Sequence, residues 1–280
     1  MASIWPAPAK LNLFLHITGQ RDDGYHLLQT IFQFIDFKDE ISIDVRRDGI
    51  IRRTTQLPGV SEANDLVIRA AKLLQTDAGT GFGADIGVNK ILPLGGGLGG
   101  GSSNAATTLV ALNLLWELNF STDQLCNLGL QLGADVPVFV RGEAVWAEGV
   151  GEKFTPVTLN EPWYLLLIPA CHVTTAELFH DPQLTRDCHP ITIRNFLSGQ
   201  VKNVFEPLVR ERYPEVDTAM RWVSEFAPAR MTGTGACVFA EFATQQAAQK
   251  ALAECPQDIQ ARVVRAQNRS PLLDALASSS

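Results

Sequence analysis

A glycine-rich segment is the strongest chemical signal in this sequence. Residues 92–104 read LPLGGGLGGGSSN and lead into the apolar run 105–116, which has good helix formers and neither glycine nor proline. Six glycines cannot build a core, and ordering them costs conformational entropy, so their backbone must approach another group closely. Free N–H groups at a helix N-terminus bind phosphate, and Ser102 and Ser103 could add hydroxyls to a phosphate or a magnesium ion. The segment therefore predicts a nucleotide phosphate site.

Other glycine patterns explain this segment less well. Gly95, Gly97 and Gly100 satisfy the dinucleotide pattern G-x-G-x-x-G, but Glu117, at the spacing of the required acidic residue, ends a helix instead of a strand. The P-loop pattern fails because Gly-Lys-Ser/Thr is absent. A flexible linker is disfavoured because a strand and a strong helix bound the segment tightly. The cation that phosphoryl transfer needs must then come from elsewhere in the chain.

Lys10 and Asp135 are the candidates for a charged pair at such a site. Alternation over residues 10–17 predicts a strand that places Lys10 and Asn12 on one face and the leucines on the other. A lone lysine there is more often a solvated edge residue, and an aspartate after Gly133 is often only a turn former. From the residues alone, both interpretations stay open.

The sequence predicts both strands and helices around these residues. We expect strands over 10–17, within 31–45, and over 84–88, 135–140, 163–168, 237–242 and 261–266. We expect helices after Asn64 or Asp65, over 105–116, from a capping box at Ser121, and over 174–179, 203–212, 214–226 and, as the last one, 245–254. Beyond Gly151 the pattern of predicted elements changes and becomes less regular. This change predicts a boundary near Pro156, hence domains 1–156 and 157–280.

Composition excludes several classes of protein. The 280 residues are 46% hydrophobic and carry a net charge of -7, so no basic face is expected to bind nucleic acid. No apolar run reaches the ~18 residues that a membrane span needs, and no export signal is visible, so we expect a cytoplasmic protein without a membrane partner. The five cysteines form no C-x-x-C, which argues against a disulfide framework or a zinc site. The oligomeric state cannot be inferred from these patterns.

Three segments together resemble a known family. Residues 8–12 (PAKLN), 93–103 (PLGGGLGGGSS) and 233–237 (GTGAC) resemble, in order and spacing, the three motifs of the GHMP kinases, named for galactose, homoserine, mevalonate and phosphomevalonate. The resemblance extends over residues 5–273. It implies an α+β fold in which an N-terminal domain like ribosomal protein S5 joins a ferredoxin-like C-terminal domain, with the active site between them. It also implies ATP as phosphoryl donor, with Mg²⁺ carried by the nucleotide and no metal site built by the protein.

The resemblance assigns roles residue by residue. The family's catalytic lysine and aspartate fall on Lys10 and Asp135, the aspartate as general base and the lysine as the group that orients and stabilises the reacting oxygen. The implied ATP-binding residues are Lys90, Pro93, Leu94, Gly95, Gly96, Gly97, Leu98, Gly99, Gly100, Gly101, Ser102 and Ser103. The family often shows Asp-Asn where this chain has Asn64-Asp65, so we carry over no adenine contact to either residue.

Three further sequence segments indicate which substrate the resemblance implies. Residues 19–26 (GQRDDGYH), 133–139 and 147–152 resemble GHMP kinases whose acceptor is a cytidine diphosphate sugar alcohol, phosphorylated on a tertiary hydroxyl in the non-mevalonate route to isoprenoid precursors. The implied substrate contacts are Asn12, Tyr25, His26 and Phe179, where Tyr25 and Phe179 stack on cytosine and His26 reads its edge. The alternatives are another GHMP kinase, such as a mevalonate kinase, and a nucleotide-binding relative without turnover.

Overall fold

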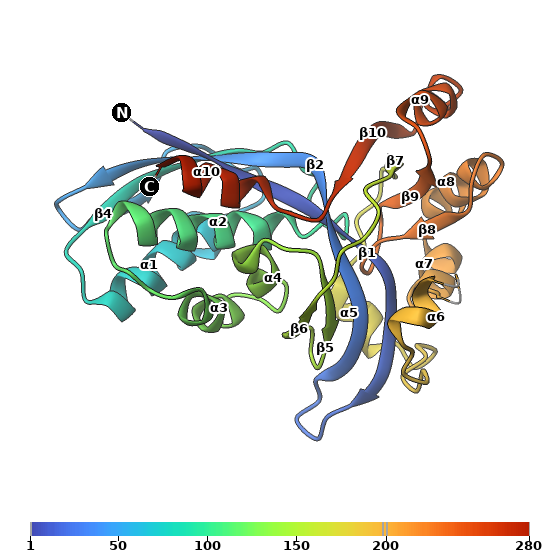
Figure 1. The fold of residues 1–280 in the computed structure, drawn as a ribbon, viewed down its shortest axis with the longest axis horizontal. Helices are drawn as coiled ribbons and strands as arrows, with labels where there is room; N and C mark the ends of the chain where they lie inside the picture. The colour runs from blue at the N-terminus through green and yellow to red at the C-terminus, as the bar shows by residue number, and fades with distance from the viewer. Residues whose placement is uncertain (1, 198, 200, 280) are drawn as a thin grey trace.

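A long antiparallel hairpin organises the molecule. The computed structural model describes residues 2–197, 199 and 201–279 of the chain. Strand β1 (Ser3–Gln20) pairs with β2 (His26–Arg46), and the Gly24 N–H closes the predicted turn by donating to the Arg21 carbonyl at 2.9 Å. Three register shifts interrupt the pairing, and shifts of this kind bend a strand. Figure 1 shows the blue hairpin turning sharply near its middle. Both faces of β1 are buried there, so Lys10 is not a solvated edge residue.

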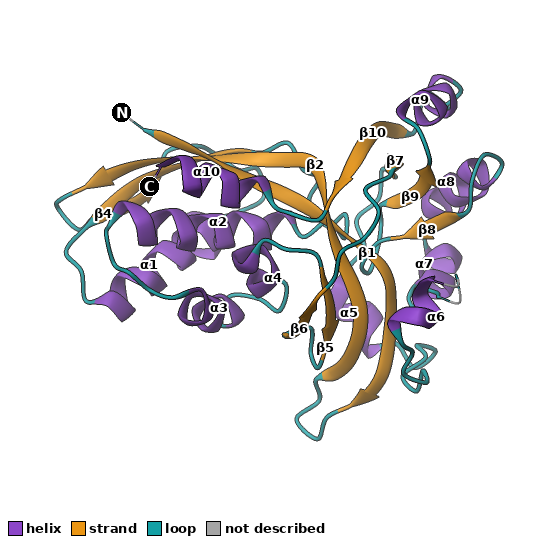
Figure 2. Cartoon of the chain, in the orientation of Figure 1, coloured by secondary structure: helices purple, strands orange, loops and turns teal. Residues whose placement is uncertain are grey.

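The first half of the chain, up to Gly142, packs helices against one part of this hairpin. Strand β4 (Gly83–Asn89) pairs with β2, and β3 (Ile51–Arg53) pairs with β4. The helical elements are η1 (Glu62–Asn64), α1 (Leu66–Ala78), α2 (Gly100–Leu115) and α3 (Thr122–Leu130). Figure 2 shows α1, α2 and α3 gathered on one side of these strands. The predicted caps are confirmed: Asp65 accepts from the Val67 N–H at 3.0 Å, and Ser121 forms a capping box with Gln124.

The strand predicted over 135–140 is wrong. These residues form the short helix α4 (Val136–Arg141), with Asp135 at its N-cap position and Gly142 ending it at a φ of 70°. A short apolar run is ambiguous between buried strand and buried helix, and packing against α2 and α3 decides for helix here. Pro137 is tolerated because it lies in the first turn, where its missing N–H is not needed.

The second half adds strands that continue the sheet. The remaining strands are β5 (Val145–Glu148), β6 (Lys153–Pro156), β7 (Trp163–Ile168), β8 (Ala229–Met231), β9 (Val238–Phe242) and β10 (Gln260–Gln267). Its helices are α5 (Thr175–His180), α6 (Ile193–Leu197), α7 (Glu206–Arg212), α8 (Pro214–Ser224) and α9 (Gln245–Ala253). Strand β10 pairs with β7 and with β2, so it joins the two halves into one sheet.

The expectation that 245–254 is the last helix is also wrong. Helix α10 (Pro271–Ser279) follows it and packs against β1 and α2, which lie in the first half of the chain. Leu272, 1% exposed, joins the core of that half, and this burial supplies the stability that a short isolated helix lacks. The division into domains 1–156 and 157–280 stays a prediction.

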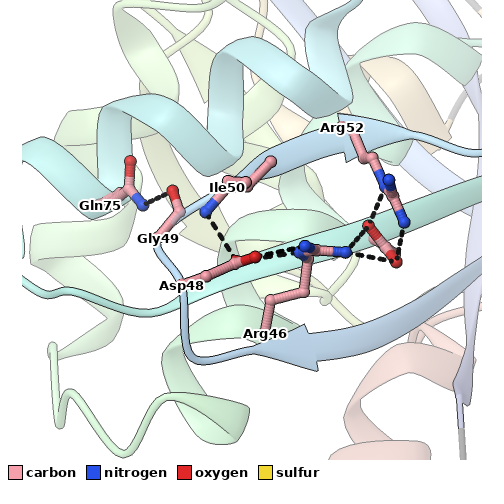
Figure 3. A network of polar contacts seen from close by, with 7 residues as sticks. Arg46, Asp48, Gly49, Ile50, Arg52 and Gln75 are labelled. Atoms are coloured by element: carbon pink, nitrogen blue, oxygen red, sulfur yellow. Dashed lines mark hydrogen bonds and ion pairs between the residues drawn. The ribbon is translucent and has the colours of Figure 1, made fainter.

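A polar network closes the outer edge of the sheet. Arg46 pairs with Asp48 and Asp85, and Arg52 holds the Asp85 carboxylate with two bonds of 2.6 and 3.0 Å. Figure 3 shows this network, with the Gln75 amide donating to the Gly49 carbonyl nearby. The two arginines lower the pKa of Asp85, and most of these groups face solvent, where ion pairs stabilise little. The network therefore fixes the edge strands of the sheet and does not line the cavity beside Lys10.

Candidate active site

Lys10 is a buried cation with three oxygen partners. Its Nζ donates to Asn12 Oδ1 at 2.6 Å and to the Gly97 carbonyl at 3.0 Å, and it lies 3.4 Å from Asp135 Oδ2. An ammonium has three N–H donors, so these contacts compensate for its loss of water. The Lys10 backbone N–H also donates to the Leu98 carbonyl at 3.1 Å. Strand β1 is therefore attached to the glycine-rich loop through both backbone and side chain.

Two threonines hold Asn12, one through its side-chain amide and one through its backbone. Its Nδ2 donates to Thr30 Oγ1 at 3.0 Å, which leaves Oδ1 facing Lys10. Its backbone N–H donates to Thr232 Oγ1 at 2.9 Å, and that hydroxyl donates to the Gly97 carbonyl at 3.3 Å. Neither threonine was predicted from the sequence. Thr232 directly precedes the third motif and could have been suspected, whereas nothing in the sequence distinguishes Thr30.

Asp135 differs from Lys10 in its access to solvent. Its side chain is 37% exposed, against 3% for Lys10, and as the N-cap residue of α4 it makes no capping hydrogen bond. The carboxylate is thus available to a substrate hydroxyl, while the ammonium lies behind it in the protein. A carboxylate can accept the proton of a hydroxyl, and a fixed cation beside it can stabilise the oxygen that loses that proton.

Several glycines of the loop have conformations or contacts that only glycine permits. Gly95, Gly97 and Gly99 have φ values of 68°, 73° and 74°. A Cβ at Gly97 would lie 2.3 Å from the Thr232 carbonyl oxygen, and one at Gly99 would lie 2.7 Å from the Phe139 ring. The glycines therefore also permit close packing of the loop on the protein itself, in addition to the approach of a ligand that the sequence predicts.

Lys90 supplies a second cation beside the loop. Its Nζ pairs with Asp39 Oδ2 at 2.6 Å, and Asp39 Oδ1 accepts the Ile91 and Leu92 N–H groups at 2.7 Å each. A Cβ at Gly100 would lie 2.9 Å from Lys90 Nζ, so the ammonium lies beside the first residue of α2. Asp39 is fully buried and was not predicted, because a charged residue within a long strand gives no sign of its partner.

The two serines at the start of α2 differ in orientation. Ser102 is half-buried and lines the cavity, whereas Ser103 is fully buried. Within the described residues, the Ser103 hydroxyl has no hydrogen-bond partner. Of the two, Ser102 is placed to meet a ligand. Its hydroxyl and the Asp135 carboxylate are oxygen donors of the kind that Mg²⁺ prefers.

A cavity of about 430 Å³ gathers most of the predicted site. This size is ordinary for a small-molecule pocket. From the predicted set it is lined by Lys10, Asn12, Lys90, Pro93, Leu94, Gly95, Gly96, Gly97, Leu98, Gly99, Gly100, Gly101, Ser102, Asp135 and Phe179. Residues from the second half complete its wall, among them Thr175 and Thr234, whose hydroxyl oxygens lie 2.8 Å apart. Sequence reasoning missed this pair.

The third motif is held by a residue that was not predicted from the sequence. The Nδ2 of Asn203 donates to the carbonyls of Met231 and Gly233, at 2.8 and 2.7 Å. The Cys237 N–H donates to the Gly96 carbonyl at 3.2 Å. Burial raises the pKa of the Cys237 thiol to about 12, so this cysteine is an inert packing residue under the loop.

His26 packs against Phe179, which lines the cavity, but His26 is not itself among the described residues that line it. Their ring centroids are 5.1 Å apart with an interplanar angle of 38°, and Phe179 also packs edge-on against Phe205 at 4.8 Å. The Arg186 Nε donates to His26 Nε2 at 3.1 Å, a contact that sequence reasoning did not anticipate. Burial is the main cause that lowers the pKa of His26, and the Arg186 and His180 charges lower it further. The ring is therefore neutral near pH 7.

Tyr25, directly before His26 in the chain, is exposed to solvent. Its side chain is 64% exposed in the hairpin turn, where its backbone N–H donates to Asp23 Oδ1 at 3.2 Å. Within the described part of the chain, Tyr25 is in none of the aromatic ring pairs, while Phe179 contacts His26. Its role stays a prediction that depends on the motif alone.

The chain matches two family models. One, described as "GHMP kinases N terminal domain", covers residues 65–143, and the other, "GHMP kinases C terminal", covers residues 191–259. The first match contains the glycine-rich loop and Asp135. The matches lie on either side of the predicted boundary near Pro156.

Relatives match over nearly the whole chain. A protein of Nitrosococcus oceani named "4-diphosphocytidyl-2-C-methyl-D-erythritol kinase" is 56% identical over 273 residues, which are 98% of each chain. A protein of the same name from Xanthomonas euvesicatoria is 57% identical over 276 residues, 98% of this chain and 94% of that one.

Solved structures share the fold. A crystal structure titled "4-(cytidine 5'-diphospho)-2C-methyl-D-erythritol kinase" superposes with a TM-score of 0.81 at 29% identity, covering 94% of this chain and 99% of that one. The mevalonate kinase of Methanococcus jannaschii superposes with a TM-score of 0.69 at 17% identity, covering 96% and 99%, which shows likeness of fold alone. The predicted α+β architecture of the GHMP kinases is confirmed.

Proposed function

We propose a mechanism from the premise that this chain belongs to the 4-diphosphocytidyl-2-C-methyl-D-erythritol kinase family of the GHMP kinases. The protein transfers the γ-phosphoryl group of ATP to the 2-hydroxyl of that cytidine-bearing alcohol, giving the 2-phosphate and ADP. The observation that carries the mechanism is the meeting of Lys10, Asp135 and the glycine-rich loop in one cavity. The roles of individual residues and the domain bounds are our proposals.

Asp135 is the general base and Lys10 the charge-stabilising group. The 2-hydroxyl oxygen attacks the γ-phosphorus, its proton passes to the Asp135 carboxylate, and the bond from the γ-phosphorus to the bridging oxygen breaks to release ADP. Because phosphoryl transfer has a loose transition state, alignment of donor and acceptor matters more than strong basicity. The contacts of Lys10 with Asn12 and Gly97 supply that alignment, since they hold the ammonium beside both the loop and the carboxylate.

Residues 93–103 and Lys90 bind ATP. Backbone N–H groups at the start of α2 and the nearby Lys90 ammonium offer positive charge to the triphosphate. Ser102 is the hydroxyl placed to meet a Mg²⁺ ion, which would be carried by the nucleotide and would neutralise phosphate charge. Asp39 keeps Lys90 in position through their ion pair.

Asn12, Tyr25, His26 and Phe179 bind the cytidine-bearing substrate. Asn12 and Phe179 line the cavity, and His26 contacts the Phe179 ring, which supports a base-binding site beside that ring. Tyr25 would supply the second ring, as its motif implies. We propose small molecules as the only partners in this chemistry, without nucleic acid or membrane, and action in the cytoplasm. The net charge of -7 supports this, and no helix among the described residues is long and apolar enough to cross a membrane.

Release of ADP with different acceptors tests the function. The cytidine diphosphate alcohol, mevalonate, homoserine and galactose are offered separately with ATP and Mg²⁺, and we expect turnover with the first alone. Turnover with mevalonate would support the alternative kinase, and no turnover with any acceptor would support a non-catalytic nucleotide-binding role. The 17% identity to the mevalonate kinase gives that alternative no support beyond the fold.

A further inference from the structure

The guanidinium of Arg186 is fixed by neutral acceptors. Its Nη2 donates to the carbonyls of Phe179 and Asp181 at 2.8 and 2.7 Å, and its Nη1 donates to the Leu184 carbonyl at 3.1 Å. A guanidinium is planar, so these three bonds set the direction of the remaining Nε–H. That N–H points at His26 Nε2, 3.1 Å away.

The direction of this bond determines where His26 carries its proton. An arginine N–H is always a donor, so His26 Nε2 must be an acceptor without a proton. The neutral ring then holds its proton on Nδ1. We propose that Arg186 is a positioning residue for substrate specificity, which locks His26 in the Nδ1–H tautomer and so presents one fixed donor to the cytosine base. This inference rests on the proposed cytidine-bearing substrate.

Two further observations support this role. Arg186 donates to the backbone carbonyl of Phe179, the residue whose ring contacts His26, so one side chain contacts two of the proposed base-binding residues. The groups that act electrostatically on His26 are Arg186 and His180, and burial together with these charges lowers the pKa of its ring. A protonated His26 would direct an Nε2–H at the Arg186 Nε–H, so the contact and the charged ring are incompatible.

The locked tautomer suits the edge of cytosine. That edge carries the acceptors O2 and N3, and bases outside a duplex are read by hydrogen bonds to this edge and by stacking. A histidine free to exchange tautomers would offer an acceptor part of the time and would repel O2 or N3 in that form. The fixed Nδ1–H is a donor at all times, so binding does not have to select one tautomer.

Nitrogen-15 NMR of the full chain with labelled histidines tests the tautomer without substrate, and His26→Ala identifies the signals by their loss. We expect a protonated Nδ1 and an unprotonated Nε2 in the wild-type protein, and a mixture in Arg186→Leu. We also expect Arg186→Leu to raise KM for the cytidine substrate about tenfold, as for a lost hydrogen bond to a charged group. Its kcat and its KM for ATP should stay unchanged. A wild-type ring protonated on Nε2 would overturn the proposal.

Arg212→Leu is the matched control. Arg212 forms an ion pair with Asp181, whose carbonyl Arg186 also contacts, but Arg212 does not hydrogen-bond His26. If Arg212→Leu raised KM as much as Arg186→Leu does, general loosening around Asp181 would explain both results, and the proposal would fail. Arg186→Leu should also add nothing to the KM of His26→Ala, because Arg186 acts through that ring. Failure of the proposed function can be distinguished from failure of this proposal, because it would appear as a lack of turnover by the wild-type enzyme.

Discussion

The ammonium of Lys10 lies 3.4 Å from the carboxylate of Asp135, and the two groups are unequally exposed. The lysine is buried between β1 and the glycine-rich loop, while the aspartate at the start of α4 is exposed to the cavity. A substrate entering from solvent therefore meets the carboxylate first. The cation lies behind it, where its position is set by Asn12 and Gly97 before any substrate binds.

Removal of either charge should abolish most turnover while the chain stays folded. We expect Lys10→Met and Asp135→Asn each to lower kcat about a hundredfold or more, because one removes charge stabilisation and the other the proton acceptor. Steady-state ADP release measures the loss, and circular dichroism checks the fold. Lys72→Met, at an exposed position of α1, is the control and should turn over normally. Wild-type rates in Asp135→Asn would show that it is not the base.

The hydroxyl of Thr232 should contribute to stability as well as to alignment. In Thr232→Val the buried Asn12 N–H loses its acceptor, and we expect the free energy of unfolding to fall by about 2 kcal/mol. Urea denaturation measures this. The control is Thr76→Val, because Thr76 is exposed and its hydroxyl only bonds its own helix. An equal change in both variants would contradict the role of the buried bond.

Asp39 should affect ATP and not the alcohol. Asp39→Asn keeps an oxygen for the Ile91 and Leu92 N–H groups but removes the charge that holds Lys90. We expect KM for ATP to rise about tenfold, as for a lost charge-assisted contact, with KM for the cytidine substrate unchanged. Separate titrations of the two substrates distinguish these effects. Asp48→Asn, in the network at the sheet edge, should change neither constant.

Gly97 should be the least replaceable glycine of the loop. Its φ of 73° is unfavourable for alanine, and the added Cβ would lie 2.3 Å from the Thr232 carbonyl oxygen. We expect Gly97→Ala to displace the loop and lose most activity. Gly59→Ala is the matched control, because Gly59 has a similar φ of 75° but open space around it. That variant should cost only about 1 kcal/mol in unfolding and keep its activity.

Acid should destabilise the protein through His16. Burial, and to a lesser extent the Lys202 charge, lowers the pKa of His16 below its ordinary value of 6.5. The unfolded chain therefore binds a proton more readily than the native one, so the free energy of unfolding falls as the pH drops below 6.5. Denaturation at pH 7.5, 6.5 and 5.5 measures the slope. We expect a shallower slope in His16→Leu.

Local chemistry made part of the structure predictable. The cap at Asp65, the capping box at Ser121 and the junction between strand, glycines and α2 depend on neighbours in sequence, and all three are confirmed. Residues 135–140 and α10 depend instead on packing against distant elements. Their local patterns are ambiguous or weak, so sequence reasoning assigned one wrongly and overlooked the other.

The same limit applies to the site. Lys10 and Asp135 could be predicted because each matches a motif, and the structure brings them together. Asp39, Thr30 and Arg186 could not, because each acts on a residue that is distant in sequence and no periodicity marks it. Supporting residues of this kind become visible only when tertiary contacts are known.

The hairpin of β1 and β2 contributes to the cores of both halves. Trp5 and Phe34 pack in the first core, whereas Leu15 and Ile17 of the same hairpin pack in the second. Lys10 lies on the stretch of β1 between them. Melting of one half should therefore displace Lys10 from the other, and we expect activity and structure to be lost in a single cooperative step on heating or in denaturant.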